Sequence, residues 1–127
     1  MIQYEGLGWR VARDSSRAHF PVLLGADRFA IELTHDEWNS LESLIRNLLN
    51  EYQGLLNQLM EEESLSVELE RNVWWGCLEG DRKSWSLQLV LDGKGELSRR
   101  GVEIYWPSPA SKAVTDAMRK IWDSSQT

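Results

Sequence analysis

The sequence predicts an α+β domain in which a largely antiparallel, curved sheet carries two helices on one of its faces. Apolar residues recur at three- and four-residue spacing from Thr34 to about Glu63, which is typical of one long amphipathic helix. Short stretches on both sides alternate between apolar and polar residues, as half-buried strands do. Turn-forming residues join these stretches at hairpin length, which favours antiparallel pairing. The expected order of elements is β-β-β-α-β-β-β-(β)-α.

The composition is that of a single globular domain covering residues 1–127, with a polar tail at 123–127. Hydrophobic residues make up 42% of the chain and charged residues 27%, which argues against intrinsic disorder. A single cysteine, Cys77, excludes an internal disulfide and favours a reducing compartment. We find no signal-peptide pattern and no apolar run of membrane-spanning length. We therefore expect a cytoplasmic protein that does not associate with membranes.

Three strands are predicted before the long helix, over residues 7–13, 20–24 and 29–33. Turn-forming residues separate the first two, and a short loop that begins at Gly25 joins the second and third as a hairpin. Pro21 has no N–H to donate, so it either lies on an edge strand or begins its strand.

The long helix has a clear beginning and a weak end. Thr34 and Glu37 have the spacing of a capping box, in which each side chain binds the other's backbone N–H. The acidic run 61–63 opposes the helix dipole at the carboxyl end, which predicts that the helix ends near Met60. Gly54 within the helix indicates either a kink or a close backbone contact.

The second half begins with alternation over residues 65–77, which Arg71 interrupts. We interpret the interruption as a bulge or an edge, with Trp75 and Cys77 in the core and Trp74 on the opposite side. Residues 85–91 and 102–106 predict further strands, and no element is assigned to 96–101. A final helix begins after Ser108, a suitable N-cap residue that precedes a proline.

Catalytic and metal-binding signatures are missing from the sequence. His19 and His35 have no partner at ligand spacing, and the paired glycines lack the pattern of a phosphate-binding loop. We expect no enzyme, no cofactor and no metal site. One enzymatic alternative stays open, in which Glu68 and Glu70 act as a general acid and base on the open face of the sheet.

The face of the sheet that the helices leave open is the predicted functional surface. Apolar side chains on an otherwise charged surface favour a protein interface, either with a partner protein or with a second copy of the chain. An unremarkable solvated sheet is the alternative. The predicted interaction residues are Leu23, Trp74, Val90 and Tyr105.

Several segments resemble a small cyanobacterial family of uncharacterised proteins. They are GWRVARD, FPVLLGADRFAIELTHDEW, VELERNVWWGCLEGD, WSLQLVL and WPSPAS. In fold, that family resembles the Whirly and transcriptional-coactivator group of single-stranded-DNA-binding regulators, which implies a curved antiparallel sheet and frequent dimerisation.

The Whirly resemblance implies single-stranded nucleic-acid binding as the alternative function, although the lysine- and glycine-rich motif of Whirly proteins is missing here. The net charge of −6 also disfavours a phosphate backbone, since residues 32–70 hold ten acidic side chains against Arg46 alone. The cationic candidates for such contacts are Arg10, Arg13, Arg17, Arg82, Lys83, Arg99 and Arg100.

Overall fold

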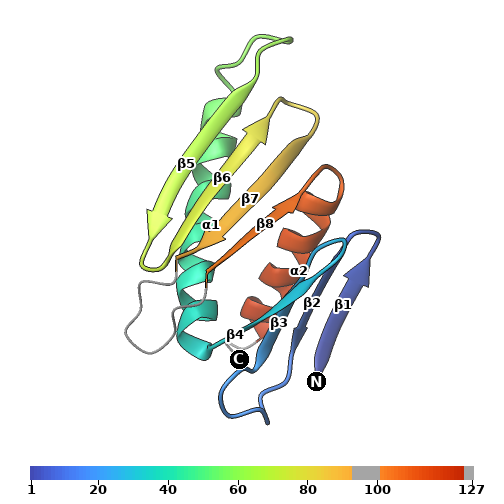
Figure 1. Ribbon diagram of the computed structural model, residues 1–127. Helices are drawn as coiled ribbons and strands as arrows, with labels where there is room; N and C mark the ends of the chain where they lie inside the picture. Colours follow the sequence, from blue (N-terminus) through green and yellow to red (C-terminus); the bar gives the residue numbers. More distant parts are fainter. Residues whose placement is uncertain (93–100, 125–127) are drawn as a thin grey trace.

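The computed structural model describes residues 1–92 and 101–124, which form two four-stranded antiparallel sheets and two helices (Figure 1). The strands of each sheet are neighbours in chain order, and a helix follows each sheet. The first half contains β1 (Ile2–Gly6), β2 (Trp9–Arg13), β3 (Val22–Gly25), β4 (Ala30–Leu33) and α1 (His35–Leu56). The second half contains β5 (Leu65–Arg71), β6 (Trp74–Gly80), β7 (Trp85–Leu91), β8 (Val102–Trp106) and α2 (Ala110–Ser124).

This arrangement confirms the predicted α+β class, the antiparallel pairing and the order of strands and helices. Two details differ from the expectation. The strands form two sheets, and β1 adds a first strand where the sequence analysis placed none. Residues 96–100, to which no element was assigned, lie outside the described residues.

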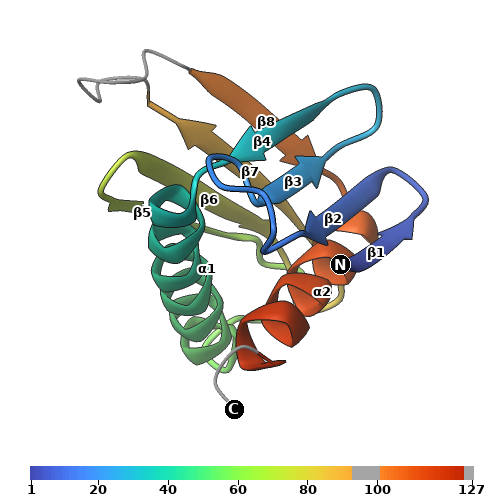
Figure 2. The same cartoon turned by 90° about the horizontal axis from the view of Figure 1, so that it is seen from below.

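The two helices cover the sheets crosswise. Helix α1 follows the first sheet along the chain but packs on β5 and β6, whereas α2 follows the second sheet and packs mainly on β1 and β2. Both helices lie on the same side of the strands (Figure 2). The hydrophobic core is therefore enclosed between the strands and the helices, and no helix of residues 1–92 and 101–124 covers the opposite face of either sheet.

Helix α1 begins with the predicted capping box. Thr34 Oγ1 accepts the N–H of Glu37 at 3.1 Å, and Glu37 Oε1 accepts the N–H of Thr34 at 2.8 Å. The helix ends at Leu56 with Asn57 as its C-cap, one turn before the expected end. Gly54 has no heavy atom near its missing side chain, so no close backbone contact explains it. No helix among the described residues is long and apolar enough to cross a membrane.

Two side chains join parts of the chain that are distant in sequence. The Trp106 indole N–H donates to the carbonyl oxygen of Gly25 at 3.1 Å, which links β8 to the end of β3. The Tyr52 hydroxyl donates to the carbonyl oxygen of Asp81 at 2.9 Å and so fixes α1 to the β6–β7 turn. These bonds satisfy polar groups inside the apolar layer, where an unpaired group would cost stability.

The structure corrects the predicted position of Trp74. A two-residue turn, not a bulge, separates β5 from β6, because Arg71 pairs directly with Trp74. Asn72 has φ of 55°, a left-handed conformation that asparagine tolerates better than most residues. The chain reverses at this turn, so Trp74 faces the helices and Trp75 faces outward. A shift of one residue moves every later side chain of a strand to the other face.

Trp74 is consequently a core residue and not part of an exposed surface. Only 1% of it is exposed. Its indole N–H donates to the carbonyl oxygen of Glu37 at 2.8 Å, so the first turn of α1 is bound to the start of β6.

We expect replacement of Trp74 by Phe to destabilise the fold, because the hydrogen bond from the indole to the Glu37 carbonyl is lost and the core loses volume. The expected loss in free energy of unfolding is about 1–3 kcal/mol. Trp75→Phe is the matched control and should change stability by less than about 0.5 kcal/mol. Urea denaturation of both variants measures the difference. A larger loss for Trp75→Phe would contradict the assignment of the two faces.

Candidate functional site

The outward side of the second sheet, which we call the acidic face, is the first candidate surface. The strand register places alternate residues of β5, β6, β7 and β8 on this side, away from α1 and α2. Its members are Ser66, Glu68, Glu70, Trp75, Cys77, Glu79, Ser86, Gln88, Val90, Glu103 and Tyr105.

A row of apolar side chains crosses the acidic face between two carboxylates. Trp75 pairs with Glu70 of β5 on one side and with Val90 of β7 on the other. Val90 in turn pairs with Glu103 of β8. Tyr105 lies beside Gln88 in the adjacent row and is 55% exposed. The surface therefore combines an indole, a phenol ring and a half-buried valine, with an acid at each end of the row.

The charges of this surface all have one sign. Glu68, Glu70, Glu79 and Glu103 are its ionisable carboxylates, and none of its members is Lys, Arg or His. The side-chain amide of Gln88 donates to the carboxylate of Glu103 and orients it beside Val90. Such a surface attracts cationic groups and repels anions.

Cys77 lies on the acidic face, contrary to the expectation that it belongs to the core. It pairs with Glu68 on β5 and with Gln88 on β7, and these neighbours leave only 9% of it exposed. Its Sγ lies 3.5 Å from the hydroxyl of Ser66. The thiol is covered, as predicted, but by side chains of the outer surface.

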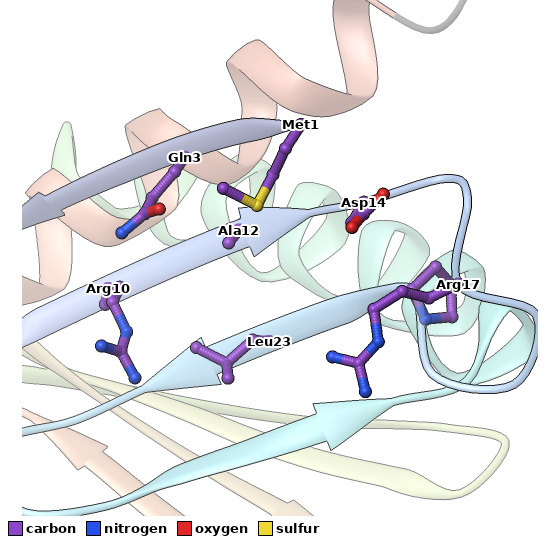
Figure 3. A pocket seen from close by; sticks show the side chains of 8 residues that line it. Met1, Gln3, Arg10, Ala12, Asp14, Arg17 and Leu23 are labelled. Carbon is purple, nitrogen blue, oxygen red and sulfur yellow. The ribbon is translucent and has the colours of Figure 1, made fainter.

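The outward side of the first sheet carries a shallow pocket of about 250 Å³, which we call the arginine pocket (Figure 3). The guanidinium groups of Arg10 and Arg17 project on either side of Leu23. Arg17 also forms an ion pair of 2.9 Å with Glu32 of β4. The lining residues are Met1, Gln3, Arg10, Ala12, Asp14, Arg17, Pro21 and Leu23.

A carboxylate at the rim of the arginine pocket reduces its positive charge. The hydroxyl and backbone N–H of Ser16 bind Asp14 and hold the pKa of its carboxyl below the ordinary value. Asp14 therefore stays ionised at neutral pH. With Glu32 paired to Arg17, the pocket presents opposite charges side by side.

The structure divides the predicted interaction residues between different places. Val90 and Tyr105 share the acidic face, Leu23 lies in the arginine pocket and Trp74 is in the core. Trp75, which the sequence analysis placed in the core, takes the position expected for Trp74. Asn72 is the sequence feature that indicates this change of positions, because asparagine is suited to the left-handed turn that ends β5.

The predicted cationic residues likewise do not form one surface. Arg10 and Arg17 come together in the arginine pocket, whereas Arg13 pairs with Ile2 and Val22 and faces the helix side. Arg82 donates to the carbonyl oxygen of Leu59 from the β6–β7 turn, where Lys83 also lies. Arg99 and Arg100 lie outside the described residues.

Comparison with known proteins gives a family but no activity. The model of the DUF1818 family, a domain of unknown function, matches residues 4–121. The chain belongs to the DUF1818 family. This DUF1818 chain is also similar to a crystal structure from Prochlorococcus sp. NATL2A, described as a protein with unknown function from the DUF155 family. The two share 43% sequence identity over 96% of this chain and 99% of the other, with a TM-score of 0.88. No curated protein matches the chain.

The acidic face lies entirely within the DUF1818 segment, whereas Met1 and Gln3 of the arginine pocket precede it. Membership in the DUF1818 family confirms the expected resemblance to a family of uncharacterised proteins. It assigns no reaction or ligand to either face.

A groove of about 210 Å³ lies between the two helices, with Tyr52 and Trp85 among its lining residues. The carboxylate of Asp116 accepts hydrogen bonds from Lys112 Nζ at 2.8 Å and from Arg119 Nη2 at 2.7 Å. Burial raises the pKa of the Asp116 carboxyl, but these two hydrogen bonds outweigh burial and lower it below the ordinary value. The three charged groups satisfy one another.

No group of three potential metal-ligating side chains occurs within residues 1–92 and 101–124.

We expect Lys112→Met and Arg119→Met to raise the pKa of Asp116, since each removes a donor to the ionised carboxyl. An NMR titration of the carboxyl carbon measures this change. The pKa of Asp116 in the folded protein is lower than its ordinary pKa near 3.8. Its ionised carboxyl therefore stabilises the fold at pH values above the ordinary pKa, and this stabilisation is lost as the pH falls through the pKa of the folded state. The double variant should therefore lose less stability on acidification than the parent chain. An unchanged titration curve would contradict the assigned contacts.

Proposed function

We propose that this chain is a non-enzymatic, cytoplasmic binding protein that holds a basic protein segment on its acidic face. The observation that carries the proposal is the row formed by Glu70, Trp75, Val90 and Glu103 across four strands. Tryptophan and tyrosine supply large contact areas at protein interfaces, and surrounding polar groups exclude water from them. The carboxylates select the charge of the partner.

The same charges argue against self-association through this face. Two copies placed face to face would bring eight carboxylates into one interface without a basic residue from the described part of either face. Like charges at short distance oppose association and must be desolvated. A basic partner avoids this cost, so we favour a different protein over a homodimer.

We expect a short peptide with a central tryptophan between lysines to bind the chain at micromolar concentration. Binding should weaken with salt, because ion pairs at the rim of the interface are screened. Trp75→Ala should weaken it at least tenfold, since the indole provides the apolar contact. Fluorescence anisotropy of the labelled peptide measures the affinity.

Phe29→Ser is the control for this experiment, because Phe29 is 44% exposed in the β3–β4 turn, outside the acidic face. It should bind the peptide as the parent chain does. Equal affinity of the Trp75→Ala variant, or equal binding of a peptide with glutamates in place of lysines, would count against the proposal.

Single-stranded nucleic acid is the second candidate ligand. Two observations favour nucleic-acid binding. Arg10 and Arg17 lie on one surface, and the sequence resembles the Whirly group in fold. Asp14 and Glu32 beside them reduce the attraction for phosphate, which is why we place this function second.

If nucleic acid is the ligand, a mixed-sequence oligonucleotide should bind with an affinity that falls steeply with salt. Arg10→Gln should reduce the slope of log affinity against log salt by about 0.7, the value for one lost contact to a single strand. Arg82→Gln is the matched control, because Arg82 lies in the β6–β7 turn of the other sheet and donates to the carbonyl oxygen of Leu59. This variant should leave the slope unchanged. Absence of binding at low salt would remove this candidate.

A further inference from the structure

We propose that the basic partner segment binds as an additional β-strand along the outer edge of β5. This inference rests on the proposed function, because it specifies how the same partner reaches the acidic face. Strand addition supplies affinity through main-chain hydrogen bonds and specificity through alternate side chains.

Strand β5 has an available edge. It is the terminal strand of its sheet, and among the described residues it is paired only with β6. Its seven residues are in continuous register with β6, whereas the other terminal strands β1, β4 and β8 have five, four and five residues. β5 contains no lysine, proline or bulge, which commonly protect an exposed edge from pairing. Its charged residues are Glu68 and Glu70 on the acidic face and Arg71 at its end on the helix side.

A groove lies beside this edge on the helix side. It has a volume of about 460 Å³ and is formed by one face of α1 together with the end of β5. Its lining residues are Leu44, Asn47, Asn50, Glu51, Leu69, Glu70 and Arg71. An added strand points every second side chain toward this groove, where the half-buried Leu69 provides apolar contact; Leu44 is fully buried.

The remaining side chains of the added strand lie on the acidic face. Glu68 and Glu70 are the β5 carboxylates on that side, so lysine or arginine in the added strand would stand opposite them. Opposite charges at facing positions stabilise a strand pair, and like charges destabilise it. The favoured ligand is therefore an extended segment that alternates basic and apolar residues.

A second copy of β5 fits this position less well. Antiparallel pairing of two β5 strands would bring Glu68 and Glu70 of both copies to the same surface. The charge of the edge thus selects a different chain, in agreement with the argument for the whole face.

The test uses a synthetic peptide of alternating lysine and valine with the intact protein. We expect slower hydrogen exchange at backbone amides of β5, and at least a tenfold loss of affinity in the Glu68→Lys/Glu70→Lys variant. A peptide with the same sequence but N-methylated at every second residue keeps its charge and loses one row of donors. It should bind at least tenfold more weakly. Asp27→Lys reverses an exposed charge in the β3–β4 turn, outside the acidic face, and should weaken binding less than threefold.

The outcomes separate this inference from the proposed function. If the N-methylated peptide binds equally well and only Trp75, Val90 and Tyr105 respond, strand addition is wrong while binding at the acidic face stands. If the alternating peptide does not bind but the tryptophan-centred peptide does, strand addition is again wrong. Failure of both peptides overturns both proposals.

Discussion

The need to cover two apolar sheet faces with helices from opposite halves of the chain determines this structure. Helix α1 leaves the first sheet and packs on β5 and β6, and α2 returns to β1 and β2. The helices meet where the rings of Trp38 and Trp122 lie 4.5 Å apart, and the Arg46 guanidinium lies 5.8 Å from the centre of the Trp122 ring. Aromatic and cation–π contacts of this kind add to the burial of the two indoles.

In the described part of the chain, this arrangement leaves the outward sides of both sheets without a helix, and the two sides have different chemistry. One presents aromatic rings among carboxylates, and the other presents two arginines around a leucine with acids beside them. An exposed sheet surface suits recognition of an extended chain better than enclosure of a small substrate. The ligand classes considered above all meet this condition.

Local patterns in the sequence were sufficient to predict much of the fold. The capping box at Thr34 and the alternation in β7 depend on neighbouring residues only, and both were predicted. β1 was missed, although Ile2 and Tyr4 alternate before a Gly6-Leu7-Gly8 turn. Its short length gave little periodicity on which to decide.

The candidate site was harder to predict, because the apolar alternation of β5 and β6 continues through the turn between them. Val67, Val73 and Trp75 fit one uninterrupted strand as well as they fit two strands. The left-handed conformation of Asn72, which depends on the pairing of β5 with β6, decides between these possibilities. Leu23 was assigned to a common surface with Val90 because sequence alternation does not reveal how many sheets the strands form.

The crosswise packing of the helices also has a consequence for synthesis of the protein. During synthesis, the first sheet and α1 leave the ribosome first. At that stage β5 and β6, which α1 covers, have not been made, and neither has α2, which covers the first sheet. The apolar sides of the first sheet and α1 cannot be buried in the native way until α2 has emerged, so the two halves cannot mature one after the other as separate domains can. Acquisition of the native structure therefore depends on contacts between distant parts of the sequence, which slows folding. During that interval the nascent chain would benefit from chaperones that shield exposed apolar segments.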